Sequence, residues 1–156
     1  MTEQVGPATE AQTAVELEEM DLDPPRVAII MGSKSDMDVM DGAAAVLRDN
    51  GIRHEVKVMS AHRQPDIVAD YCRAARARGL RVIIAGAGLS AALPGVAAAH
   101  CDLPVIGVPL SSRLSAMGGL DAILSTLQMP PGVPVAGVGL DNAKNAGHLA
   151  LRILGT

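Results

Sequence analysis

Five short strand-like segments, each followed within a few residues by a segment of helical spacing, constrain the fold of this chain more than any other feature. The first, Val27-Ala28-Ile29-Ile30-Met31, has no polar position, which is typical of a strand buried on both faces of a sheet. Further strand-like segments lie at 54–59, 81–85, 105–108 and 133–138, and helices are expected at 36–49, 65–78, 89–100, 119–127 and 142–154. Connections this short between alternating strands and helices require a parallel sheet covered on both faces.

The pattern predicts an α/β fold, a flavodoxin-like three-layer doubly wound five-stranded parallel sheet with strand order 2-1-3-4-5. Residues 25–156 are expected to form this single domain. Residues 1–24 hold seven acids and no Lys or Arg, and they are predicted to be an acidic, mobile tail. In such sheets ligands bind beyond the carboxyl ends of the strands, so functional residues are expected in the loops after the first three.

Composition excludes several classes of function. Tyr71 is the single aromatic residue and the formal net charge is −4, so neither stacking nor general phosphate attraction favours nucleic acid. No apolar stretch is long enough to span a membrane, and the first residues lack the pattern of a secretory leader. Cys72 and Cys101 lie in no metal or disulfide motif. We therefore expect a cytoplasmic protein, without membrane or nucleic-acid partners, that acts on a small molecule.

The loop after the first strand, Gly32-Ser33-Lys34-Ser35-Asp36, has the features of an anion site. It offers a glycine for close backbone approach, two hydroxyls, and amide donors at a helix N-terminus. It matches neither GxGxxG nor the Walker pattern, so no dinucleotide or triphosphate is implied. Ser35 or Asp36 would equally serve as an ordinary helix cap.

The loop after the second strand, Ser60-Ala61-His62-Arg63, places an imidazole beside a guanidinium at the same sheet edge. Histidine titrates with a reference pKa of about 6.5, and arginine grips phosphate or carboxylate with paired hydrogen bonds. A lone histidine is more often structural, but its place at a strand end beside an anion loop favours catalysis. The third loop, at 86–95, is almost devoid of polar side chains and supplies no base, and it would also serve as a packing turn. His54, His100 and His148 lie on different elements, so no metal is expected.

Taken together, these loops resemble those of the N5-carboxyaminoimidazole ribonucleotide mutases, the PurE family. The resemblance rests on 32–36, 60–63 with Pro65, 86–88 with 93–95, and 128–130 with 132–134, and it covers roughly 26–154. It implies transfer of CO2 from the exocyclic nitrogen of the ribonucleotide to ring carbon four in purine biosynthesis, without ATP, metal, biotin or another cofactor. It also implies a homo-octamer, which would account for the apolar segment 89–99, although a buried helix would look similar.

The resemblance also implies residue roles. His62 would be the general acid and base, Ser33 and Arg63 would hold the 5′-phosphate, and Asp36 would hold the ribose hydroxyls. The remaining substrate-binding residues would be Gly32, Ser35, Ser60, Ala61, Ala87, Gly88 and Leu93.

The third loop departs from the family pattern. Many mutases read Gly-Gly-Ala-Ala-His-Leu-Pro-Gly there, whereas this chain has Ala92 in place of the histidine. The related aminoimidazole ribonucleotide carboxylases, which use free CO2, also lack that histidine, but they typically carry Ser-Ala-His-Lys in the second loop, where this chain has Arg63. The mutase is therefore favoured. Direct carboxylation and a non-catalytic nucleotide-binding module remain as alternatives.

Overall fold

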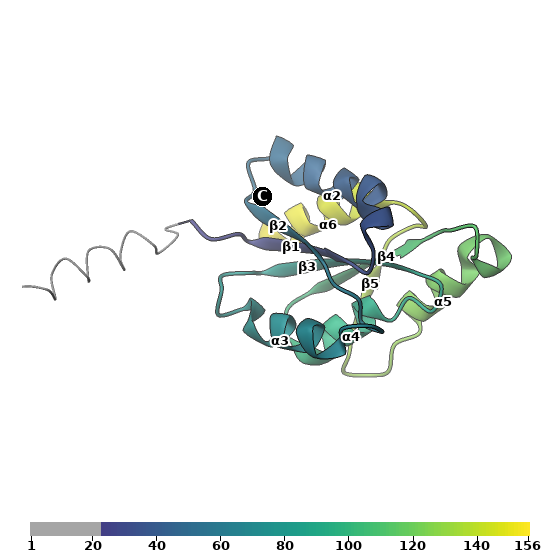
Figure 1. Cartoon of the computed structure of the whole chain (residues 1–156). Helices are drawn as coiled ribbons and strands as arrows, with labels where there is room; N and C mark the ends of the chain where they lie inside the picture. Colours follow the sequence, from purple (N-terminus) through teal and green to yellow (C-terminus); the bar gives the residue numbers. More distant parts are fainter. Residues whose placement is uncertain (1–22) are drawn as a thin grey trace, which may run out of the picture.

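The computed structural model describes residues 23–156 (Figure 1), so almost all of the predicted acidic tail lies outside the described residues. Within this range the strands are β1 Val27–Met31, β2 His54–Val58, β3 Val82–Gly88, β4 Val105–Leu110 and β5 Ala136–Gly137. The α-helices are α2 Met37–Asp49, α3 Pro65–Ala75, α4 Leu93–His100, α5 Leu120–Leu127 and α6 Ala143–Leu154. Short 3-10 turns at Lys34–Asp36 and Ala116–Gly119 lead into α2 and α5.

The strands form one parallel sheet in the order β2-β1-β3-β4-β5, as predicted. Val27 at the start of β1 lies opposite His54 of β2 and Val82 of β3, so these strands begin level and their carboxyl ends reach the same edge. The order reverses at β1, where the chain crosses first to one side of the sheet and then to the other. The fold is the doubly wound, flavodoxin-like α/β arrangement expected from the sequence.

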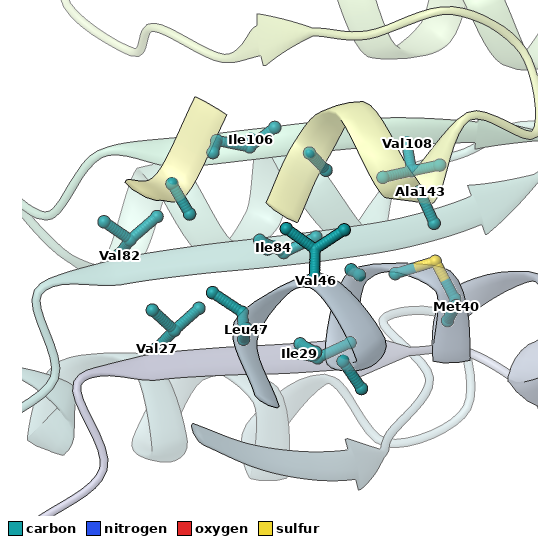
Figure 2. Packing of buried hydrophobic residues seen from close by; sticks show 14 of the residues in the cluster. Val27, Ile29, Met40, Val46, Leu47, Val82, Ile84, Ile106, Val108 and Ala143 are labelled. Atoms are coloured by element: carbon teal, nitrogen blue, oxygen red, sulfur yellow. The ribbon is translucent and has the colours of Figure 1, made fainter. Parts of the chain in front are cut away.

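Alternating residues of each strand serve the two faces of the sheet. Val27, Ile29 and Met31 pack under α2 and α6, while Ala28 and Ile30 face the layer that contains α3 and α4. Figure 2 shows the first of these layers, with Val27, Ile29, Val82, Ile84, Ile106 and Val108 from the sheet and Met40, Val46, Leu47 and Ala143 from the helices. Burial of each large aliphatic side chain contributes about 1.5–3 kcal/mol, which is why β1 tolerates no polar residue.

The boundaries of β3 differ from those predicted. β3 continues to Gly88 instead of ending at 85, and the following helix begins at Leu93 instead of 89. The glycine at 86 does not end the strand but lets it pass under α2, because a Cβ there would lie 2.4 Å from Met40 Sδ.

The fifth strand also differs from the prediction. It is confined to Ala136–Gly137, whereas 133–138 was expected. Pro134 has no N–H to donate to the ladder of β4, so pairing cannot extend through it. The strand at this edge of the sheet is therefore short.

Helix α5 lies close to the sheet because glycines face it. Gly107 of β4 and Gly137 of β5 are partners in the ladder, and both lie under α5. A Cβ at 107 would lie 2.3 Å from Thr126 Cγ2 and 2.9 Å from Val135 Cγ1. A larger residue at 107 would therefore push α5 away from β4.

We predict that Gly107→Ala lowers the free energy of unfolding by about 1–3 kcal/mol through overpacking. Gly139→Ala is the matched control, because a Cβ there would meet its nearest atom at an ordinary 3.7 Å. Urea unfolding of both variants measures the difference. Equal stability of the two would show that α5 moves without cost.

Candidate active site

The carboxyl ends of β1, β2, β3 and β4 surround a cavity of about 490 Å³. All eleven predicted site residues line it: Gly32, Ser33, Ser35, Asp36, Ser60, Ala61, His62, Arg63, Ala87, Gly88 and Leu93. Their convergence follows from the strand order, because β1 lies between β2 and β3. Three loops that are distant in sequence therefore meet at one place.

The loop after β1 is held by its own serines. Ser33 is extended, with φ −147°, and its Oγ accepts a hydrogen bond from the Ser35 amide at 3.2 Å and lies 2.8 Å from Ser35 Oγ. Ser33 therefore caps the 3-10 turn, a role that the sequence had suggested for Ser35 or Asp36. Asp36, at the N-cap position of α2, makes no side-chain capping bond, so its carboxylate is not used in forming the helix.

Asp36 is half-buried at the cavity wall. Burial raises the pKa of this carboxyl above its ordinary value, and a hydrogen bond with the Ser33 backbone offsets only part of the effect. Because water solvates the carboxylate poorly here, its charged form is costly in the free protein. A ligand that donates hydrogen bonds to the Asp36 carboxylate would offset the free-energy cost of burying it.

The loop after β2 carries His62 and Arg63 on a short fixed turn. Ser60 Oγ accepts from the Arg63 amide at 3.2 Å, and the Ser60 carbonyl accepts from the Gln64 amide at 2.8 Å, just before Pro65 starts α3. His62 and Arg63 are both exposed in the single chain. The described residues therefore leave His62 open to water.

Strand β2 and helix α3, which flank this loop, are joined by Glu55. Its carboxylate accepts from Tyr71 Oη at 2.6 Å and from Arg78 at 2.7 Å, while the Arg78 guanidinium lies 5.2 Å from the Tyr71 ring centroid. Although burial raises the pKa of Glu55, the bonds from Arg78 and Tyr71 outweigh it and lower the pKa overall. The single aromatic residue thus has a structural role, because it joins α3 to β2.

The part of the cavity wall that follows the third strand in the sequence prediction begins within β3 itself. Ala87 and Gly88 are the last residues of β3, and a Cβ at 88 would lie 2.9 Å from the Leu110 carbonyl oxygen. Only glycine permits this approach of β3 to the end of β4. Ala92, just before α4, also lines the cavity and presents a methyl group where many mutases have histidine.

Sequence reasoning missed the contribution of β4. Leu110, Ser111 and Ser112 line the cavity, as do Leu89 and Ser90 after β3. Asp141 holds Ser111, accepting from its amide at 2.8 Å and from its hydroxyl at 2.5 Å. The signal was present in the sequence, because Ser111 and Ser112 directly follow an apolar run whose carboxyl end belongs to the same edge.

The two cysteines and the histidines other than His62 do not line the cavity. In residues 23–156 no three His, Cys, Asp or Glu side chains are grouped to hold a metal ion. Burial raises the pKa of the Cys72 thiol to about 12, and Cys101 is a free thiol that donates to the Ala97 carbonyl. No helix in this part of the chain is long and apolar enough to cross a membrane.

The fold and the cavity define an α/β protein with a ligand site at the switch point of a parallel sheet. The AIR carboxylase family model matches residues 26–156, and the chain belongs to this family.

Two named relatives support the assignment. The N5-carboxyaminoimidazole ribonucleotide mutase of Pyrococcus abyssi is 58% identical over 130 residues, covering 83% of this chain and 74% of the relative. The mutase of Mycobacterium tuberculosis is 56% identical over 131 residues, covering 84% and 74%. The crystal structure of Treponema denticola PurE aligns with a TM-score of 0.73 at 34% identity, covering 84% of this chain and 80% of that one.

Asp36→Asn is expected to raise the free energy of unfolding at pH 7, because it removes a carboxylate whose burial is costly. A carboxyl with a raised folded pKa favours folding below the unfolded pKa, near 3.9, and this contribution is lost as the pH rises through the folded pKa. The gain in the variant should therefore shrink as the pH falls towards 4. Thermal unfolding from pH 4 to 7 measures it, with the exposed Asp38→Asn as control. A wild type more stable than Asp36→Asn at pH 7 would contradict the argument.

Proposed function

We propose that the protein converts N5-carboxyaminoimidazole ribonucleotide to 4-carboxyaminoimidazole ribonucleotide in de novo purine biosynthesis. The observation that carries the proposal is the meeting of His62 and Arg63 with Ser33 and Asp36 in one cavity of about 490 Å³. A proton carrier, an anion-binding group and a hydroxyl-binding carboxylate are the groups that this ribonucleotide requires. The names of the relatives at 56–58% identity point to the same reaction.

The ribose phosphate is bound by the loops after β1 and β2. Arg63 and Ser33 hold the 5′-phosphate, and the amides between Gly32 and Ser35 add donors at the start of the helical segment. Asp36 accepts hydrogen bonds from the ribose hydroxyls, which offsets the cost of its burial. The remaining contacts come from Ser35, Ser60, Ala61, Ala87, Gly88 and Leu93.

His62 moves the proton in both halves of the reaction. When the bond between the exocyclic nitrogen and the carboxyl carbon breaks, CO2 leaves, the electron pair stays on the nitrogen, and His62 protonates it. Ring carbon four then attacks CO2, and His62 takes the proton from that carbon. Among the side chains that line the cavity, the ionisable groups other than hydroxyls belong to Asp36, His62 and Arg63. Arginine stays protonated at neutral pH, so Arg63 does not exchange protons with the substrate.

The two steps return the histidine to its starting state, so the reaction consumes no net proton. We place the reaction in the cytoplasm, because a charged ribonucleotide does not cross a bilayer. Fractionation that finds the activity in the membrane pellet would contradict this location.

We further propose that the protein works as a homo-octamer whose neighbouring subunits cover the exposed side of His62. Leu114 and Met117, which are 81% and 83% exposed, provide apolar surface for such contacts. A mass from light scattering that differs from about eight times the 16.0 kDa of the chain would contradict the octamer.

The decisive experiment is turnover of N5-carboxyaminoimidazole ribonucleotide in bicarbonate-free buffer, followed by the absorbance of the product. A mutase converts it without added bicarbonate. A carboxylase would leave that compound unconverted and would instead carboxylate aminoimidazole ribonucleotide at a rate that rises steeply with bicarbonate. A non-catalytic nucleotide-binding module would turn over neither compound.

We predict that His62→Asn lowers kcat by 10²-fold or more while the ribonucleotide still binds, because asparagine keeps polarity and rough size but cannot titrate. His148→Asn, on the exposed side of α6, is the matched control and should leave kcat unchanged. Steady-state kinetics and a calorimetric titration with aminoimidazole ribonucleotide provide the two measurements. If His62→Asn keeps more than about a tenth of the wild-type rate, the acid–base role is wrong.

A further inference from the structure

One of the polar side chains in the cavity wall is held by a carboxylate. Ser111, directly after β4, donates its hydroxyl hydrogen to Asp141 Oδ2 at 2.5 Å, and its amide donates to Asp141 Oδ1 at 2.8 Å. The Asp141 amide in turn donates to the carbonyl of Pro109 in β4 at 2.9 Å. These three hydrogen bonds fix both the position of Ser111 in the wall and the direction of its hydroxyl group.

The direction of the hydroxyl limits what Ser111 can offer a ligand. A carboxylate has lone pairs and no hydrogen to give, so Ser111 is the donor in the bond between the two side chains. Serine has one hydroxyl hydrogen and two lone pairs. Toward the cavity, Ser111 Oγ can therefore only accept a hydrogen bond. Ser60 differs, because its Oγ accepts from the Arg63 amide and keeps its hydrogen for a ligand.

The exocyclic nitrogen of the ribonucleotide supplies a matching donor. In the proposed mode of binding, Asp36 accepts from the ribose hydroxyls, while Ser33 and Arg63 donate to the phosphate. The exocyclic nitrogen carries an N–H both before and after the carboxyl group moves to ring carbon four. An acceptor fixed in the cavity wall suits this N–H.

We propose that Ser111 Oγ accepts a hydrogen bond from the exocyclic nitrogen of the ribonucleotide, and that Asp141 sets this polarity by holding the hydroxyl hydrogen. This inference rests on the proposed function. Ser111 is a substrate-binding residue for the base, and Asp141 is a positioning residue. Because the N–H persists through both steps, the bond stabilises substrate and product alike. Its loss should raise KM and leave kcat almost unchanged.

Asp141→Asn reverses the polarity of the hydroxyl without removing the side chain. Asparagine tolerates the left-handed φ of 56° at this position as aspartate does, and its carbonyl oxygen still accepts from the Ser111 amide. The asparagine nitrogen then donates to Ser111 Oγ and turns the hydroxyl hydrogen toward the cavity. Two hydrogens then oppose each other, so the amine should bind more weakly although the variant removes a negative charge near an anionic ligand.

Calorimetric titration with two ligands measures the effect. Aminoimidazole ribonucleotide carries the exocyclic amine, whereas imidazole ribonucleotide lacks it and is otherwise the same. The wild type should bind the first more tightly, and Ser111→Ala and Asp141→Asn should each reduce that preference by about 3–10-fold, as expected for one hydrogen bond. Ser111→Thr, which keeps the hydroxyl, should retain the preference. In steady-state kinetics the same loss should appear in KM, with kcat changed by less than about twofold.

A double-mutant cycle separates positioning from general support of the fold. In the Ser111→Ala background, Asp141→Asn should cause no further loss of preference, because Asp141 acts through the hydroxyl. Two matched controls should leave the preference unchanged. Ser125→Ala removes a hydroxyl that donates to the Asp121 carbonyl in α5, outside the cavity, and Asp38→Asn removes an exposed carboxylate of α2.

The outcomes separate this inference from the proposed function. A wild type that does not convert N5-carboxyaminoimidazole ribonucleotide refutes both. If the wild type converts it but shows no preference for the amine, or if Ser111→Ala keeps the preference, the role of Ser111 is wrong. An equal loss in Ser111→Thr and Ser111→Ala would contradict it as well. A loss from Asp141→Asn that is the same with and without the Ser111 hydroxyl would overturn the positioning role of Asp141.

Discussion

The level alignment of parallel strands is the constraint on which the rest of this structure depends. Residues 27–31 of β1 are fully buried between β2 and β3, so their backbone groups must pair on both sides and their side chains must be apolar on both faces. Along β1, polar residues can then appear only where the strand ends. Six serines, Asp36, His62 and Arg63 line the cavity at the carboxyl ends of the strands, and the strand order brings them together.

The site shows the usual conflict between function and stability. Asp36 is half-buried, and its burial raises the pKa of the carboxyl without a full compensating partner. Leu89 and Asp141 hold left-handed backbone conformations around the same edge, and Asp141 uses its carboxylate to fix Ser111 in the cavity wall. Burial of the Asp36 carboxylate and the left-handed backbone at Leu89 and Asp141 each cost folding free energy. Away from this edge, β1 and α2 follow the ordinary rules of burial.

Most of the fold and the cavity could be predicted because periodicity and strand order are local and topological properties of the sequence. The run at 27–31 and the turn at Gly51 mark a strand and a helix end without reference to the rest of the chain. The end of β3 could not be predicted from the sequence, because a glycine such as Gly86 usually indicates a turn. Here Gly86 is required by the close approach of Met40, which lies on a helix distant in sequence. The role of Ser111 depends on Asp141, thirty positions away, and the left-handed φ of Leu89 leaves no trace in a sequence that has no glycine there. Tertiary contacts decide all three.

The alanine at 92 sharpens the chemical demand on His62. A second imidazole there would offer another proton carrier, but a methyl group offers none, so one histidine must serve both halves of the proposed reaction. The chemistry allows this, because the proton given to the nitrogen in the first half is replaced by the proton lost from carbon in the second.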